Sequence, residues 1–384
     1  MSDLLPVRKF VAPEIIFGSG SRHLIAQHVL SLHGRSVLLV SDPGVIRAGW
    51  TGEIADLLSS KGLDVTLFHE LTPNPKTAEI MKGAEVYRRN GCDVIISVGG
   101  GSAIDCGKAL GVAVTNHCHI LEMEGVDLVK LPGPPMICIP TTAGSSADVS
   151  QFAAFSDETR RRKTGIVSKT MVPDLTIIDP ETTVTMPPRL TAATGLDALC
   201  HGIEAYVSNA SSTITDLNAL EAIRLLTDNL LRAYDSPEDL KAREPVMLAS
   251  MYAGLAMSNA SLGLVHSMAH SLGGYLDYPH GECNAKLLKH VIPYNYPFAS
   301  ERYRKIEQIM RGSKPGGSGG PDGLVEVLEE MIQHMGMDQG LSELGMKEED
   351  IPYLTDIALQ DACHYTNPRP VVRSDIEELF FRAL

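Results

Sequence analysis

Short apolar runs alternate with amphipathic stretches along the first half of the chain. Runs rich in β-branched residues and bounded by turn residues are typical of buried strands, and they occur at 37–40, 65–68, 94–98, 136–139 and 176–178. Apolar residues three and four positions apart predict helices, and this spacing occurs at 45–60, 77–90 and 103–114. Strand and helix in alternation predict right-handed βαβ units and a mostly parallel sheet.

The pattern changes at Met186-Pro187-Pro188, where two consecutive prolines end any preceding element. Beyond them, Leu, Ala and Met recur at helical spacing over 191–311 and 322–384, with almost no β-branched alternation. The glycine-rich stretch between these regions, 312–320, predicts a surface loop. We therefore expect two domains, an α/β domain at 1–188 and an all-helical domain at 189–384.

Composition narrows the class of protein. The chain has 384 residues, of which 44% are hydrophobic, so it can bury a large core. Its net charge of -14 disfavours nucleic acid and anionic membrane surfaces as partners. Seven cysteines without a CxxC pair argue against a disulfide framework and a thiolate zinc site. No apolar run approaches the ~18 residues of a membrane span, so we expect a cytoplasmic protein that acts on small molecules.

A glycine-rich turn follows the strand predicted at 94–98. Gly99-Gly100-Gly101-Ser102 comes directly before a predicted helix. Glycines let the backbone approach a pyrophosphate closely, and the free N–H groups of a helix N-terminus attract its charge. The turn is neither GxGxxG nor GxxxxGK[ST], so it indicates phosphate binding, with an ordinary tight turn as the alternative.

Two further polar segments follow predicted strands. Thr141-Thr142-Ala143-Gly144-Ser145-Ser146 lies where ligands bind in open α/β sheets, although such a cluster also suits a helix N-cap. Asp42 ends the first predicted strand. Its carboxylate could accept from a ribose 2′-hydroxyl, or Asp42-Pro43-Gly44 could be only a turn.

Histidines gather in the helical half. Asp197 and His201 are four residues apart, as are His266 and His270, so each pair shares one helix face among small and apolar residues. A single such histidine is usually a hydrogen-bonded core residue. Two pairs together with Pro279-His280-Gly281 favour a divalent metal instead. One carboxylate and several imidazoles without a thiolate suit Fe²⁺ or Zn²⁺.

Five motifs occur in order along the chain and resemble one family. They are Gly99-Gly100-Gly101-Ser102-Ala103-Ile104-Asp105, Pro140-Thr141-Thr142-Ala143-Gly144, Ala193-Thr194-Gly195-Leu196-Asp197-Ala198, Gly263-Leu264-Val265-His266-Ser267-Met268-Ala269-His270 and Pro279-His280-Gly281. Together they strongly resemble the iron-containing (group III) alcohol dehydrogenases, the family of lactaldehyde reductase and 1,3-propanediol dehydrogenase. The resemblance covers nearly the whole chain, to Thr366-Asn367-Pro368-Arg369-Pro370.

The resemblance implies a fold and a set of site residues. It implies a Rossmann-like N-terminal domain and an all-helical C-terminal domain, as in dehydroquinate synthase-like architectures. It makes Asp197, His201, His266 and His280 the metal ligands and His270 the catalytic residue beside the substrate. It makes Asp42, Asn74, Gly100, Gly101, Ser102, Thr141, Thr142, Ser145 and Lys163 the contacts of NAD. Without the resemblance, Lys163 would belong to a solvated charge run, Arg160-Arg161-Arg162-Lys163.

The activity that the resemblance implies is NAD-dependent, reversible oxidation of a primary alcohol or diol to an aldehyde. Fe²⁺ is the implied metal, with Zn²⁺ as the alternative, and a dimer or larger homo-oligomer is the implied assembly. Two other functions stay open: a glycerol dehydrogenase-like zinc polyol dehydrogenase of the same fold, and a non-catalytic dinucleotide-sensing or scaffold protein. The second should have lost metal ligands, whereas all four positions are filled here.

Overall fold

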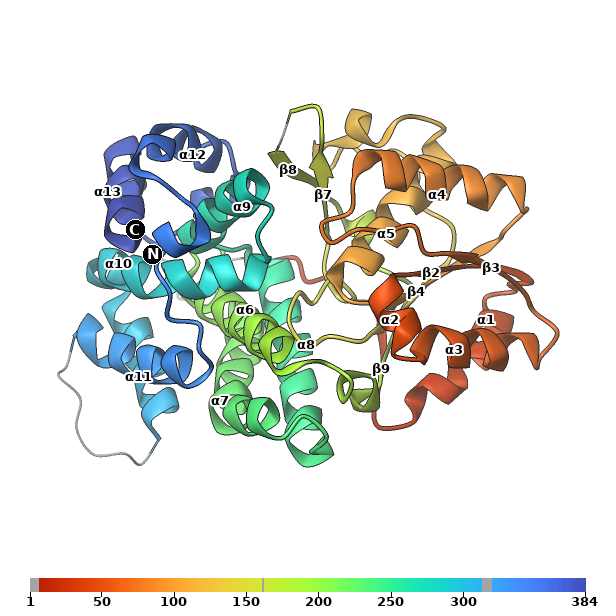
Figure 1. Cartoon of the computed structure of the whole chain (residues 1–384), viewed down its shortest axis with the longest axis horizontal. Coiled ribbons are helices and arrows are strands. Elements are labelled where there is room, and N and C mark those ends of the chain that lie inside the picture. Colours follow the sequence, from red (N-terminus) through yellow and green to blue (C-terminus); the bar gives the residue numbers. More distant parts are fainter. Residues whose placement is uncertain (1–6, 161, 313–319) are drawn as a thin grey trace.

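The computed structural model describes residues 7–160, 162–312 and 320–384. Two parts of the chain lie side by side, an α/β part formed by the first half and a helical part formed by the second (Figure 1). The expected fold class is confirmed. The surface loop predicted at 312–320 falls almost entirely on residues 313–319, which lie outside the described residues.

A six-stranded sheet in the order β1-β9-β6-β4-β2-β3 forms the centre of the α/β part. Every pair of neighbouring strands is parallel. The strands are β1 (Glu14–Phe17), β2 (Ser36–Ser41), β3 (Asp64–Phe68), β4 (Val94–Gly99), β6 (Met136–Pro140) and β9 (Leu175–Ile178). All five strands predicted from the sequence are present in this sheet, and β1 is the strand of this sheet that was missed.

Helices cover both faces of this sheet: α1 (Ile25–Ser31), α2 (Pro43–Arg47), α3 (Trp50–Ser59), α4 (Thr77–Arg89) and α5 (Gly101–Asn116). Alternate residues of one strand enter different cores, because side chains along a strand point to opposite faces. In β2, Leu38 packs in the apolar cluster shared with α4 and α5, whereas Leu39 packs in the cluster shared with α1 and α3. Burial on both faces explains why these strands are continuously apolar.

The prediction of one helix over 45–60 is wrong. The structure has two helices there, α2 and α3, separated by Ala48 and Gly49. Gly49 has φ 91°, in the left-handed region that a helix interior does not allow. The apolar spacing continues across this break, so periodicity alone did not reveal it.

A second, three-stranded sheet was also missed. It has the order β5-β8-β7, with β5 (Gly125–Val126), β7 (Phe152–Asp157) and β8 (Arg162–Val167). β7 and β8 pair antiparallel. Basic residues at the start of β8 and Ala and Ser in β7 have weak strand propensity, which concealed both strands. This sheet lies between the two halves and contacts α9 through β8 (Figure 1).

The second half contains only helices among the described residues after Thr183, as predicted. They are α6 (Pro188–Val207), α7 (Thr213–Asp235), α8 (Leu240–Ala260), α9 (Leu264–Leu276), α10 (His280–Arg311), α11 (Pro321–His334), α12 (Ile351–Ala358) and α13 (Arg373–Ala383). Pro187 and Pro188 do more than end the preceding segment. They are the N-cap and first residue of α6, where proline is favoured because its missing N–H has no helical partner.

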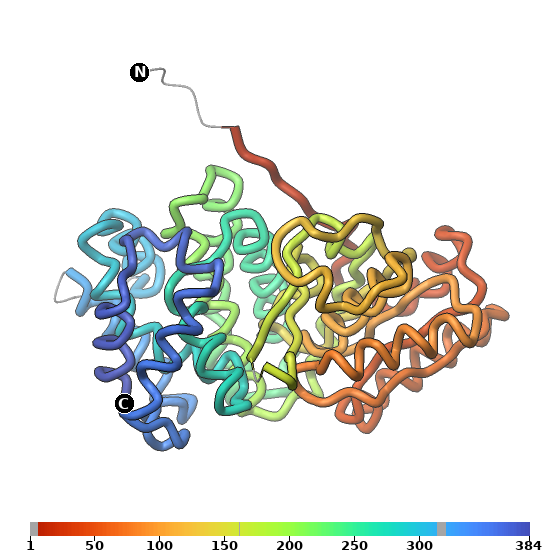
Figure 2. Tube along the Cα trace, turned by 90° about the horizontal axis from the view of Figure 1, so that it is seen from above, coloured from red at the N-terminus to blue at the C-terminus, as the bar shows by residue number. Residues whose placement is uncertain are grey.

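Short 3₁₀ helices occur in the connections of both halves: η1 (Ser21–Leu24), η2 (Ile120–Met123), η3 (Lys169–Met171), η4 (Pro180–Thr183), η5 (Ser342–Leu344), η6 (Glu348–Asp350) and η7 (Ala362–Thr366). Residues 7–13, which precede β1, run out from the body of the molecule (Figure 2). In the described residues no single helix is long and apolar enough to cross a membrane. Taken together, α8 and α9 are long and apolar enough, but the two helices are bent by 102° relative to each other.

Candidate active site

The glycine turn forms a tight corner between β4 and α5. Gly99 has φ 157°, and a Cβ there would lie 2.7 Å from Cβ of Ala103. Gly100 is the N-cap of α5 and offers no side chain to its first N–H groups. The corner therefore leaves the positive end of a helix of 16 residues open to a ligand.

The hydroxyl loop that follows β6 packs directly against this corner. A Cβ at Gly100 would meet Thr142 at 3.1 Å, and one at Gly101 would meet Oγ of Ser145 at 2.8 Å. The backbone N–H of Thr141 donates to the Gly99 carbonyl over 3.0 Å. The parallel register of β4 and β6 brings these two loops to the same sheet edge.

Asp42 lies at the same edge and is also a helix cap. Its Oδ1 accepts from the N–H groups of Gly44 (2.8 Å) and Val45 (3.1 Å) at the start of α2. Its Oδ2 faces the glycine corner, 3.3 Å from where a Gly99 Cβ would lie. Asp42-Pro43-Gly44 is therefore the start of a helix rather than a turn, and the cap leaves one carboxylate oxygen directed at the corner.

Asn74 and Lys163 complete the predicted cofactor set. The Asn74 N–H donates to Ser102 Oγ (3.3 Å), and Lys163 Nζ donates to Asn74 Oδ1 (3.1 Å). Lys163 is in β8 and burial lowers its pKa, so it is not part of a solvated charge run. Its neighbour Arg162 pairs instead with Glu124. The nine predicted residues therefore form one connected group together with Gly99.

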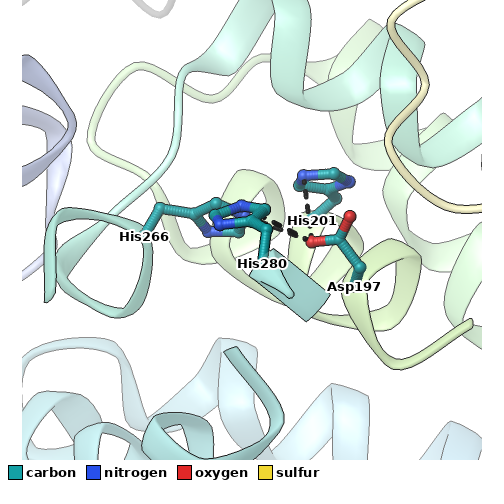
Figure 3. A group of neighbouring side chains, drawn as sticks. All are labelled: Asp197, His201, His266 and His280. Atoms are coloured by element: carbon teal, nitrogen blue, oxygen red, sulfur yellow. Dashed lines mark ion pairs between the residues drawn. The ribbon is translucent and has the colours of Figure 1, made fainter. Parts of the chain in front are cut away.

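The four predicted metal ligands converge in the helical half (Figure 3). Asp197 and His201 come from α6, His266 from α9, and His280 is the first residue of α10. The Nε2 atoms of the three histidines lie 3.7, 3.8 and 3.8 Å from Asp197 Oδ1. These distances are too long for hydrogen bonds.

Electrostatics favours a cation at Asp197, His201 and His280, whereas His266 must lose a proton before it can bind one. Burial lowers the pKa of His201 to about 4 and that of His280 well below its usual value, so both imidazoles are neutral at pH 7 and can act as ligands. Burial would raise the pKa of Asp197, but its interactions with His201, His280 and His266 lower it, so this carboxylate is ionised. Burial opposes a charge on His266, yet contacts with Cys200, Asp197 and Glu204 raise its pKa well above normal.

His270 lies beside the cluster, one turn after His266. Its ring stacks on that of His280 with centroids 5.0 Å apart. Its Nδ1 is 2.7 Å from Asp361 Oδ2, and its side chain is 25% exposed. Burial would raise the pKa of Asp361, but the charge of His270 and hydrogen bonds from His270 and Cys363 lower it. His270 is thus held by a carboxylate and open to the outside.

Sequence reasoning missed three polar residues of this centre. Glu204 contacts His266, Asp361 contacts His270, and the Asn284 side chain donates to Asp197 over 2.7 Å. Glu204 lies three residues after His201 on the same face of α6, and Asn284 four residues after His280 in α10, so helical spacing could have found both. Asp361 is 91 residues from His270 and has no such signal.

Two glycines bring the cofactor corner and the metal cluster together. A Cβ at Gly144, in the hydroxyl loop, would lie 2.4 Å from Cβ of Thr194 in α6. A Cβ at Gly281, next to His280, would lie 2.1 Å from the Ala193 carbonyl. The loop and the start of α10 therefore both touch α6 within one turn of Asp197.

Known proteins match this chain over nearly its whole length. Residues 12–180 match the model of iron-containing alcohol dehydrogenases, and residues 191–384 match that of the C-terminal part of the Fe-containing alcohol dehydrogenase family. The chain is 37% identical over 380 residues to 1,3-propanediol dehydrogenase from Citrobacter freundii, covering 97% of this chain and 98% of that protein. It is 34% identical over 377 residues to NAD-dependent methanol dehydrogenase from Bacillus methanolicus, covering 98% and 99%.

A solved structure agrees with these sequence matches. The crystal structure of a 1,3-propanediol oxidoreductase superposes with a TM-score of 0.95 at 35% identity, covering 99% of this chain and 100% of that one. The resemblance inferred from the five motifs is confirmed. The chain belongs to the iron-containing alcohol dehydrogenase family, a family of oxidoreductases.

Proposed function

We propose that this protein is an NAD-dependent oxidoreductase that interconverts a primary alcohol or diol with its aldehyde, using a divalent metal held by Asp197, His201, His266 and His280. The observation that carries the proposal is the convergence of these four side chains next to a helix N-terminus suited to a dinucleotide. The names of the relatives, a propanediol dehydrogenase and an NAD-dependent methanol dehydrogenase, support the substrate class and the cofactor.

The four side chains fit a metal ion. Ligand atoms about 2.1 Å from a common tetrahedral centre lie about 3.4 Å apart, close to the 3.7 to 3.8 Å between Asp197 and the three imidazoles. One carboxylate and three imidazoles suit Fe²⁺, with Zn²⁺ as the competing ion because it ranks higher in affinity. Such an ion supplies Lewis acidity toward an alcohol oxygen.

The connected group at the sheet edge would hold NAD, which accepts hydride from the alcohol carbon. The N–H groups at Gly100, Gly101 and Ser102 would bind the pyrophosphate, since they open α5 without a side-chain cap. The hydroxyls of Thr141, Thr142 and Ser145 and the side chains of Asn74 and Lys163 would orient the rest of the dinucleotide. Asp42 would accept from the adenosine ribose through the oxygen that faces Gly99.

His270 would move the substrate proton. Asp361 accepts a hydrogen bond from Nδ1 of His270. The Nε2 atom of His270 is then left to exchange a proton with the substrate or with water. The partial exposure of His270 gives that proton a route outward. A fully buried histidine without a carboxylate partner would have neither a fixed Nδ1 proton nor a route for the substrate proton to the solvent.

NADH formation over a panel of alcohols and diols tests the proposal. Anaerobically Fe²⁺-loaded and Zn²⁺-loaded protein should be compared on methanol, ethanol, 1,2-propanediol, 1,3-propanediol and glycerol. We expect metal-dependent turnover on primary alcohols or diols. Turnover restricted to glycerol with Zn²⁺ would support the polyol alternative, and dinucleotide binding without any turnover would support a sensor.

Self-association is part of the same proposal. β1 is an edge strand of the sheet, with one side unpaired by another strand among the described residues, and such an edge can pair with a second copy. Light scattering of the purified protein should give the mass of a dimer or larger assembly. A monomer at all concentrations would contradict this.

A further inference from the structure

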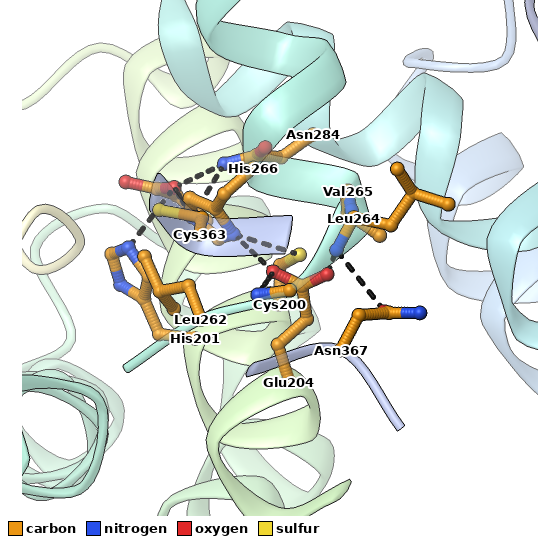
Figure 4. Close-up of polar contacts among 12 residues, drawn as sticks. Cys200, His201, Glu204, Leu262, Leu264, Val265, His266, Asn284, Cys363 and Asn367 are labelled. Atoms are coloured by element: carbon orange, nitrogen blue, oxygen red, sulfur yellow. Dashed lines mark hydrogen bonds and ion pairs between the residues drawn. The ribbon is translucent and has the colours of Figure 1, made fainter. Parts of the chain in front are cut away.

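A buried carboxylate stands behind one of the proposed ligands. Glu204 in α6 is only 3% exposed and accepts from three donors (Figure 4). Its Oε2 lies 2.6 Å from His266 Nδ1 and accepts from the Gly263 N–H over 2.9 Å, and its Oε1 accepts from the Val265 N–H over 2.7 Å. Because a carboxylate only accepts, the proton of the short contact belongs to His266 Nδ1.

We propose that Glu204 is a positioning residue that fixes the tautomer and ring orientation of His266, so that its Nε2 is unprotonated and faces the metal. The inference rests on the metal centre of the proposed function. Residues that accept from the far nitrogen of a ligating histidine orient the ring and make it a better ligand. Glu204 Oε2 is such an acceptor, because it lies 2.6 Å from His266 Nδ1.

The same carboxylate fixes the start of α9, which carries His266 and His270. Gly263 is the N-cap of α9, and a Cβ there would lie 2.7 Å from Glu204 Oε1, so a larger residue would displace the carboxylate. The intervening N–H of Leu264 donates to Asn367 Oδ1 over 3.2 Å. Three successive N–H groups are therefore held by Glu204 and Asn367, and only Glu204 also reaches the imidazole.

The two other proposed histidine ligands lack an equivalent support. The Nδ1 atoms of His201 and His280 are buried and have no hydrogen-bond partner in the described part of the chain. Cys200 Sγ is 3.9 Å from His266 Nδ1, a longer and weaker contact than that of Glu204. Asp197, His201 and Glu204 follow one another at spacings of four and three, so one face of α6 provides two ligands and the group that orients a third.

The test compares metal binding by the wild type and by Glu204→Gln. Metal-stripped protein is titrated with Co²⁺ in competition with a chromophoric chelator, and the visible Co²⁺ spectrum reports the coordination geometry. Glutamine has the size of glutamate but presents an NH₂ group where the backbone N–H groups or His266 need an acceptor. We expect about 10- to 100-fold weaker binding and an altered spectrum.

Asn367→Ser is the control, because it weakens the cap at Leu264, together with the Asn367 bonds to Asn295 and the Arg369 carbonyl, without touching His266. It should lower the melting temperature but leave the Co²⁺ affinity and spectrum unchanged. Wild-type affinity and spectrum in Glu204→Gln, with only a lower melting temperature, would make Glu204 a helix cap and overturn the inference. A wild type that binds no Co²⁺ would instead overturn the metal centre itself.

A measurement on the wild type avoids any dependence on how the variant folds. In ¹⁵N-histidine-labelled, Zn²⁺-loaded protein, the Nδ1 proton of His266 should resonate downfield of those of His201 and His280, because it alone is held by a carboxylate at 2.6 Å. An Nδ1 proton of His266 at the position of the other two would contradict the proposal.

Discussion

His280 is the most exposed of the four proposed ligands, with 21% of its side chain accessible against 6% or less for the other three. We predict that His280→Ala removes most of the bound metal and nearly all turnover while the protein still binds NADH, since the glycine corner belongs to the other half. His290→Ala, farther along the same helix, is the control and should keep its metal. Elemental analysis checks both, and unchanged metal content in His280→Ala would refute its assignment.

His270 should affect rate more than metal retention. We predict that His270→Ala keeps its metal, loses about 100- to 10,000-fold in turnover, which is the usual contribution of a general acid–base group, and has an altered pH–rate profile. His364→Ala is a suitable control because the His364 side chain contacts the Asp361 backbone carbonyl and the Tyr365 ring rather than the metal cluster. Full activity with an unaltered profile would make His270 a packing residue.

At the residue scale, the sequence predicted those site residues that lie one helical turn apart on the same helix. Asp197 and His201 were found because they lie four apart on one helix, and the structure brings His266 and His280 to them. Asp361 could not be found, because its contact with His270 depends on how a distant segment packs. Glu204 was overlooked although a charged residue on an apolar helix face was visible in the sequence.

At the element scale, the junction of β2 and α2 should decide cofactor choice. Asp42 would face the 2′-phosphate of NADP with like charge, at a cost of about 1 to 4 kcal/mol, or about tenfold to several hundredfold in preference. We predict that Asp42→Gly admits NADP, chiefly by improving its apparent affinity, and still folds, because glycine replaces an N-cap at a cost of only a few tenths of a kcal/mol.

Asp42→Asn serves as the control, since it keeps a capping side chain and removes only the charge. The ratio of kcat/KM for NAD and NADP is the measurement, in the wild type and in both variants. A wild type that prefers NADP, or a ratio that neither substitution changes, would show that Asp42 is only a cap.

The close contact between the hydroxyl loop and α6 should contribute to the stability of the protein. A Cβ at Gly144 would lie 2.6 Å from the Thr194 carbonyl, which is backbone and cannot rotate away. We predict that Gly144→Ala destabilises the protein by about 1 to 3 kcal/mol. Gly52→Ala, in α3 with no atom within 4 Å of the new Cβ, should be neutral or stabilising. Denaturant unfolding compares the two, and equal stability would contradict the close packing.

Elements were predictable where one physical signal dominates. Strands β2, β4 and β6 are buried on both faces and therefore continuously apolar. The small sheet was missed because its strands derive stability from pairing and from contact with α9 rather than from composition. The break at Gly49 was missed because one left-handed glycine can end a helix without disturbing the apolar spacing.

At the scale of the whole molecule, the proposed chemistry lies where two differently built halves meet. The parallel sheet brings the glycine corner and the hydroxyl loop to one edge, and the helical half brings four ligands together beside it. Asn74 in the first half donates to Asp277 in the second over 3.1 Å, so the halves also meet at the cofactor group. The domain boundary at residue 188 stays a prediction, although α6 begins there.

Anaerobic titration of the metal-stripped protein with Fe²⁺, followed by NADH formation from 1,3-propanediol and NAD, tests the central claim most directly. The account predicts that activity rises in proportion to added iron and reaches a plateau at one Fe²⁺ per chain, and that His280→Ala shows no such rise. Activity in the stripped protein that iron does not increase, or an equal rise in His280→Ala, would contradict it.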